Sequence, residues 1–203
     1  PFCGSSAISF YISTLHPLKY KYILNDNNKH LIDAYNTFRD DEKLKKFINI
    51  LNKECKDITK EKYKTIIKED NLKGWFIKHK IYSIRPGLFR LDYIHKDFKF
   101  LLDCPIINFL RTEDITFTNI DGIEIIKKYK DDNTNLIILD PPYLELYNDF
   151  YYDSNTNVYE YLYYNKILEM KCKIILILND SWIIKLLFLE LIKKTYPKLY
   201  QPN

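Results

Sequence analysis

Short apolar runs alternate with stretches of helix-spaced apolar residues along most of the chain. Four of the runs are typical of buried strands in a parallel sheet, and they cover Tyr20–Leu24, Ile115–Asn119, Leu136–Leu139 and Lys173–Leu178. Helical spacing predicts helices within Ser5–Leu15, Leu31–Phe38, Leu44–Leu51, Tyr63–Ile67, Gly122–Tyr129 and Ser181–Lys193. This alternation predicts an α/β fold with a doubly wound sheet.

The segment 41–104 interrupts the alternation. Its first part is helical and basic, whereas Ser83–Cys104 contains Arg85-Pro86-Gly87 and then alternating aromatic and basic residues, a pattern that favours a hairpin or irregular structure. We therefore predict a core formed by residues 1–40 and 105–203, with an inserted, mostly helical region over residues 41–104. A tyrosine-rich loop is expected from Tyr143 to Tyr164.

Charge is distributed unevenly along the chain. The whole sequence has 31 Lys and Arg against 27 Asp and Glu, a net charge of +4. Within Lys43–Lys80, however, there are 12 lysines and 5 acids, with Trp75, Phe76 and His79 nearby. This segment suits a surface that contacts a nucleic-acid backbone, and a solvated helical face is an equally good interpretation.

Neither metal sites nor membrane spans are indicated. The cysteines are too widely separated for a zinc site or a disulfide framework, which favours a reducing, intracellular location, cytoplasmic or nuclear. Apolar runs are too short or too interrupted by charge to cross a bilayer, and no signal-peptide pattern opens the chain, so a soluble protein is expected. The abundance of Ile, Lys, Asn and Tyr resembles translation from an AT-rich genome, such as that of a virus or protist.

The turn Asp140-Pro141-Pro142-Tyr143 directly follows the apolar run Leu136–Leu139. Open α/β sheets bind ligands at the carboxyl edge of their strands, where this turn would lie. There Asp140 and the Pro141 carbonyl could accept the two hydrogens of an exocyclic amino group, while Tyr143 stacks on the attached ring. The target would be a planar amine, most simply adenine.

Two further features suit a nucleotide site. Small residues in Pro1–Ala7 would let a ligand approach the backbone, and Asp26 follows the first predicted strand, where a carboxylate can accept ribose hydroxyls. Asp121 follows the second strand in the same way. Each acid taken alone could instead cap the helix that follows it.

The order of these motifs resembles the Dam-like class of DNA N6-adenine methyltransferases, which combines a Pro-Phe-x-Gly-x-Gly loop, an Asp-x-Asn segment before Leu-Ile-x-x-Tyr, an insert and Asp-Pro-Pro-Tyr. The resemblance implies a Rossmann-like methyltransferase fold, S-adenosylmethionine as cofactor, duplex DNA with a flipped adenine as substrate, and no metal. The residues it implies are Phe2, Gly4, Ser6, Asp26 and Asp121 for the cofactor, Asp140, Pro141, Pro142 and Tyr143 for catalysis, and Phe150, Tyr152, Arg85 and Arg90 for the substrate.

The chain also departs from the family pattern. Ser6 stands where the family usually has glycine, Gly122 stands where an aromatic residue often packs on the cofactor adenine, and the family's Lys-x-Gly-Gly-Lys segment has no counterpart. Both substitutions predict weaker cofactor binding. Three interpretations stay open: an active DNA adenine methyltransferase, a degenerate methyltransferase fold that serves as a nucleic-acid-binding or structural subunit, and the same chemistry on RNA or a protein amide.

Overall fold

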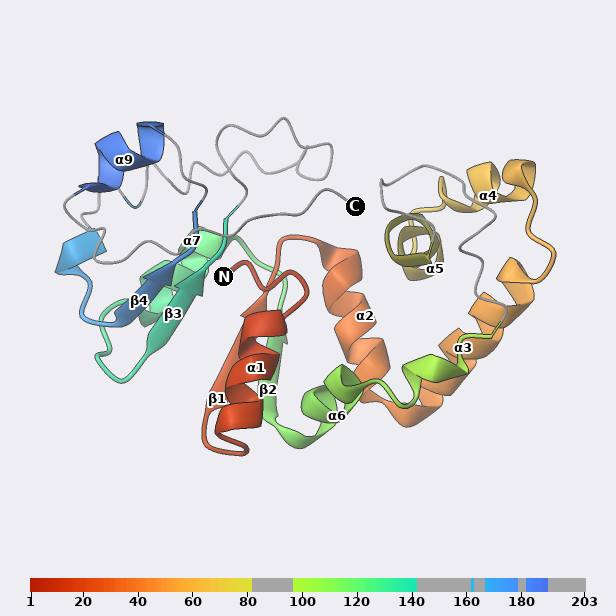
Figure 1. Cartoon of the computed structure of the whole chain (residues 1–203), viewed down its shortest axis with the longest axis horizontal. Helices are drawn as coiled ribbons and strands as arrows, with labels where there is room; N and C mark the ends of the chain where they lie inside the picture. The colour runs from red at the N-terminus through yellow and green to blue at the C-terminus, as the bar shows by residue number, and fades with distance from the viewer. Residues whose placement is uncertain (82–96, 142–161, 163–166, 179–181, 190–203) are drawn as a thin grey trace. The chain divides into compact units, whose positions relative to one another are not determined.

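The computed structural model describes residues 1–81, 97–141, 162, 167–178 and 182–189. These residues belong to two units (Figure 1). The N-terminal unit comprises Cys3–Asp121, and the C-terminal unit comprises Gly122–Asn203 together with Pro1–Phe2.

The N-terminal unit combines two parallel strands with several helices. The elements are α1 (Ala7–Leu15), β1 (Lys21–Asn25), α2 (Lys29–Arg39), α3 (Asp41–Cys55), α4 (Lys60–Ile66), α5 (Leu72–Phe76), the π-helical turn η1 (Ile77–Ile81), the 3-10 turn η3 (Lys99–Leu101), α6 (Pro105–Thr112) and β2 (Asp114–Thr118). The register places Lys21 opposite Asp114 and Asn25 opposite Thr118, so both strands end at the same edge.

In the C-terminal unit, a second pair of parallel strands forms. Its described elements are α7 (Gly122–Tyr129), β3 (Leu136–Leu139), the 3-10 turn η4 (Ile167–Glu169), β4 (Lys173–Leu176) and α9 (Trp182–Phe188). Leu136 lies opposite Lys173, and Leu139 lies opposite Leu176. The apolar core of this unit joins α7, β3 and α9 through side chains such as Ile126, Leu139 and Phe188.

Buried faces of α2 and α3 build the core of the N-terminal unit. The α2 side chains Leu31, Ile32, Tyr35 and Phe38 and the α3 side chains Leu44, Phe47, Ile48 and Leu51 are buried, as their helical spacing predicts. Fully burying a leucine stabilises the fold by roughly 1.5–3 kcal/mol. The same cluster includes Leu24 of β1, so the helices after residue 40 share one core with the strand that leads to the candidate site.

Side-chain caps fix the helix starts that position this unit. Asn28, Asp40, Thr59 and Asn71 each accept a hydrogen bond from a backbone N–H in the first turn of the helix that follows. The Asp40 cap lowers the pKa of its carboxyl group, chiefly through the Lys43 backbone N–H.

The α/β class is confirmed, and all four predicted strands are present. The described strand pairings join β1 to β2 and β3 to β4, so a single doubly wound, Rossmann-like sheet stays a prediction. Helix α6 was not predicted, although Pro105 at its first position and buried Ile107 and Leu110 three residues apart are typical helix signals. The predicted irregular segment Ser83–Cys104 is described only from residue 97, and the Tyr143–Tyr164 loop lies almost entirely outside the described residues.

Candidate active site

A fully buried asparagine joins the carboxyl ends of β1 and β2. The side-chain carbonyl of Asn25 accepts hydrogen bonds from the Thr118 hydroxyl (2.9 Å) and the Ile120 N–H (3.1 Å), and its amide donates to the Ile120 carbonyl (2.9 Å). Asn25 is 0% exposed, so it makes all three bonds away from solvent. The loop that leads from β2 to Asp121 is therefore held against the end of β1.

Asp26 lies next along the chain and is only partly buried. One carboxylate oxygen accepts the Gly4 N–H (3.0 Å) and the other accepts the Asn28 N–H (3.0 Å). The Asp26 carbonyl also accepts from the Asn119 side chain (2.7 Å). Because a carboxylate has about four acceptor positions, roughly two remain for a ligand.

The alternative role of Asp26 as a helix cap is wrong. Asn28 caps α2, because its side-chain oxygen accepts the Leu31 N–H (3.2 Å). Asp121 is exposed and α7 begins at the next residue, so its assignment to the cofactor stays a prediction.

The loop from Cys3 to Ser6 is tied to the same edge by backbone bonds. The Cys3 N–H donates to the Asn25 carbonyl (2.8 Å), and the Ser6 N–H donates back to the Cys3 carbonyl (2.7 Å). Gly4 has a positive φ of 46°, and among the described residues no atom lies within 4 Å of where a Cβ on Gly4 would stand. The loop thus leaves open space beside its backbone.

Tyr35 of α2 also binds this loop. Its hydroxyl donates to the Gly4 carbonyl, and its ring stacks on Phe117 of β2 with centroids 5.7 Å apart. Burial, followed by the neighbouring Cys3 thiol, raises the pKa of Tyr35 above its ordinary value, so the phenol keeps its donor proton at neutral pH. Neither Tyr35 nor Asn25 was assigned a role from the sequence, although Asn25 and Asp26 end an apolar strand and Tyr35 shares the helical spacing of the next apolar residues.

Ser6 adopts a left-handed backbone, with φ 54° and ψ 20°, and is buried at the start of α1. Glycine reaches this conformation without steric cost, whereas for a residue with a side chain it costs roughly 1–2 kcal/mol. The loop therefore keeps the shape that glycine favours, even though serine occupies the position.

Cys3 is a packing residue rather than a nucleophile. Its side chain packs against the core of the N-terminal unit. Burial first, and then the negative charge of Asp26, raise the pKa of its thiol to about 12. The thiol is consequently protonated at neutral pH, which suits a packing role.

The C-terminal unit holds the other predicted residues that are described. Asp140 directly follows β3 and is exposed, whereas Pro141 is buried. Residues 142 and 143 of the motif, and the substrate residues Phe150, Tyr152, Arg85 and Arg90, lie outside the described residues.

Phe2 packs inside the C-terminal unit, where it contacts the apolar core. A Cβ on Gly122 would lie 2.6 Å from the Phe2 ring, closer than real atoms approach. With the phenyl ring in this position, there is no room for a side chain at position 122. The role of Phe2 beside a cofactor stays a prediction.

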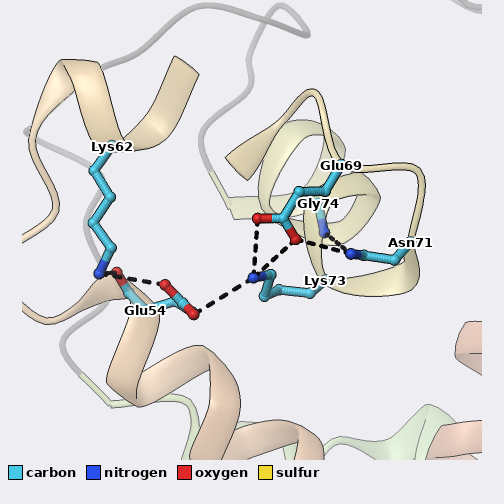
Figure 2. Close-up of polar contacts among 6 residues, drawn as sticks. All are labelled: Glu54, Lys62, Glu69, Asn71, Lys73 and Gly74. Atoms are coloured by element: carbon cyan, nitrogen blue, oxygen red, sulfur yellow. Dashed lines mark hydrogen bonds and ion pairs between the residues drawn. The ribbon is translucent and has the colours of Figure 1, made fainter. Parts of the chain in front are cut away.

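Two lysines of the basic segment are engaged in a charge network (Figure 2). Lys62 pairs with Glu54 (3.3 Å), and Lys73 pairs with both Glu54 (3.5 Å) and Glu69 (2.9 Å). The Asn71 side chain also donates to Glu69 (2.8 Å). This network joins α3, α4 and α5, so these two lysines have structural partners.

Neither a metal cluster nor a membrane-spanning helix occurs among the described residues. In that part of the chain, no group of three or more His, Cys, Asp or Glu side chains could hold a metal ion. None of the helices described is both long and apolar enough to cross a bilayer.

Comparison with known proteins identifies the family. Residues 1–102, half of the chain, match the family model of the D12 class N6 adenine-specific DNA methyltransferases. No curated protein matches the chain. The matched residues include the Gly4 loop, Asp26 and Tyr35, which the structure brings together. This agrees with the resemblance to Dam-like enzymes, and the chain belongs to the D12 class N6 adenine-specific DNA methyltransferase family.

Proposed function

We propose that this protein transfers a methyl group from S-adenosylmethionine to the N6 amino group of an adenine in DNA. Membership of a DNA adenine methyltransferase family gives the reaction class. The observation that carries the finer proposal is the Asp26 carboxylate, which the Gly4 and Asn28 N–H groups orient at the carboxyl edge of β1 and β2. Ligands of open α/β sheets bind at such an edge.

The residues at this edge fit the cofactor. Asp26 retains acceptor positions for ribose hydroxyls, and Gly4 offers open space for close approach to the backbone. Asp121, at the end of the loop held by Asn25, is proposed to contact the cofactor's adenine side. When bound, S-adenosylmethionine would supply an electrophilic methyl group on its sulfonium centre.

The substrate adenine is assigned to the turn after β3. Asp140 and the Pro141 carbonyl would accept the two N6 hydrogens, which concentrates the nitrogen lone pair toward the methyl carbon. The bound cofactor would supply the methyl group and leave as a neutral thioether, and the proton that N6 loses would pass to water. These residues contribute position and electrostatics rather than a covalent intermediate.

In duplex DNA the target base must leave the stack before these contacts can form. We assign Pro142 and Tyr143 to the pocket for the extruded adenine, Phe150 and Tyr152 to its surroundings, and Arg85 and Arg90 to the DNA. Each of these assignments rests on the family resemblance.

Calorimetric titration with S-adenosylmethionine and transfer of a labelled methyl group to DNA test the proposal. Asp26→Asn should weaken cofactor binding about tenfold or more, because bonds to a charged acceptor contribute roughly 1.5–3 kcal/mol. Asp140→Asn should retain cofactor binding but lose methyl transfer. Asp114→Asn, at an exposed residue paired with Lys21, is the matched control.

The outcomes separate the competing interpretations. A chain that binds no S-adenosylmethionine contradicts the proposal and favours a degenerate fold. Methylation of RNA or a peptide amide in preference to DNA would reassign the substrate. Equal activity of Asp140→Asn and the wild type would remove the turn after β3 from the catalytic site.

A further inference from the structure

The lysines of residues 41–76 fall into two groups. The first group has acidic partners: Lys43 pairs with Asp40 (3.8 Å), Lys45 pairs with Glu42 (3.3 Å), and Lys62 and Lys73 belong to the network around Glu54 (Figure 2). These pairs lie within or between helices. The charges of these lysines are therefore already paired within the protein.

The side chains of the second group are exposed and make no hydrogen bond or ion pair with any residue in the described ranges. It consists of Lys46, Lys53, Lys56, Lys60, Lys64 and Lys68, which we call the lysine face. Two exposed acids, Asp57 and Glu61, lie in the same stretch. The lysine face therefore keeps an excess of positive charge that the protein does not neutralise.

Two of these lysines lie on the exposed side of α3. Lys46 and Lys53 are two turns apart on α3 and project opposite the face that buries Leu44 and Leu51, both 0% exposed. Seven residues of helix span about 10 Å, the rise of roughly three base pairs of DNA. Lys46 and Lys53 are thus spaced to reach phosphate groups about three nucleotides apart on one strand.

We propose that the lysine face binds the phosphate backbone of duplex DNA through charge, without reading sequence and without needing the methyl donor. The inference rests on the proposed function for its choice of DNA. Amphipathic helices that bind lipid surfaces insert an apolar face, whereas the apolar face of α3 is packed into the protein core. Charge complementarity with DNA therefore fits this surface better than a membrane does.

The test measures binding of the full chain to a short fluorescent DNA duplex of arbitrary sequence, in the absence of S-adenosylmethionine, as a function of salt. The test variant changes Lys53, Lys56, Lys60 and Lys64 to Gln. The control variant changes Lys19, Lys21, Lys99 and Lys127 to Gln. Both variants lower the formal net charge from +4 to zero. They differ in where charge is removed and in pairing, because Lys21, Lys99 and Lys127 have acidic partners and the test lysines have none among the described residues.

The test variant should bind DNA about tenfold or more weakly at moderate salt. The slope of log K against log salt should fall by about 0.9 for each phosphate that is no longer neutralised, or on the order of three to four in total. The control variant should bind nearly as the wild type does. If the fourfold test variant unfolds, the double variants Lys53→Gln/Lys56→Gln and Lys60→Gln/Lys64→Gln give the same comparison with half the effect each.

Equal weakening in the test and control variants would overturn the proposal, because only overall charge would then matter. Unchanged DNA binding together with abolished binding to phosphatidylserine vesicles would overturn it in favour of a membrane. Since no methyl donor is present, lysine-dependent DNA binding by a chain that fails to methylate would refute the proposed function and leave this inference standing.

Discussion

Replacing Asn25 by alanine tests how the candidate site is held together. The change removes three hydrogen bonds at 0% exposure, two to the backbone of Ile120 and one to the Thr118 hydroxyl. At a net value of about 1 kcal/mol for each bond, the loss approaches 3 kcal/mol. Ile120 is 44% exposed, so water can replace part of its bonding. We expect a net cost of roughly 2–3 kcal/mol, a large part of the 5–15 kcal/mol typical of a domain.

Native-state hydrogen exchange measures this cost residue by residue, which avoids assuming that the whole chain unfolds in one step. The Ile120 N–H should exchange much faster in Asn25→Ala, and the Leu110 N–H in the core of the same unit should report the global loss. Asn27→Ala changes an exposed neighbour and should stay within about 0.5 kcal/mol of the wild type.

Two results would refute the reasoning. One is an Asn25→Ala variant as stable as Asn27→Ala, which would mean that the three bonds contribute nothing beyond those made with water. The other is unchanged protection of the Ile120 N–H, which would mean that something other than Asn25 holds the loop before Asp121.

Three further predictions concern the stability of the chain and follow from the surroundings of Gly74, Ser6 and Cys3. Gly74→Ala should cost about 1–3 kcal/mol in denaturant melts, because the new Cβ would lie 2.6 Å from the Ile66 and Glu69 carbonyl oxygens. Ser6→Gly should stabilise the chain by about 1 kcal/mol in the same melts, since it relieves a left-handed backbone. The Cys3 thiol should resist alkylation at pH 9, and stability should fall between pH 9 and 12, because only the unfolded thiol ionises there.

Two of these predictions have a matched control. Ser9→Gly, inside α1, should destabilise by about 0.5–1 kcal/mol, opposite in sign to Ser6→Gly. A Cys3→Ala variant should lose its share of the stability change between pH 9 and 12. Rapid alkylation of Cys3 in the folded chain at pH 9, or a Gly74→Ala variant as stable as the wild type, would contradict the packing described around each residue.

The spacing of apolar residues predicted the strands and most helices, because the side chains that face the core recur at the period of each element. Gly122–Tyr129 and Leu136–Leu139 were predicted with the bounds that the structure has. Helix α6 was overlooked because its eight residues lie between a segment without clear period and a strand, although Ile107 and Leu110 are buried on one face.

The candidate site was predictable only in part. A strand end followed by an acid is visible in the sequence, so Asp26 could be proposed. Its bond to the Gly4 N–H joins residues 22 positions apart, and the Lys73–Glu54 pair joins residues 19 positions apart. Such partners depend on how elements pack. Sequence charge therefore identified a basic segment but could not separate its paired lysines from its exposed ones.

The close packing of Phe2 on Gly122 constrains how this sequence can change over generations. A residue with any side chain at position 122 would collide with the phenyl ring, and a smaller residue at position 2 would leave a void against Gly122. In descendants of this chain, a side chain gained at position 122 therefore requires either that the Phe2 ring rotates away from Gly122 or that a smaller residue replaces Phe2.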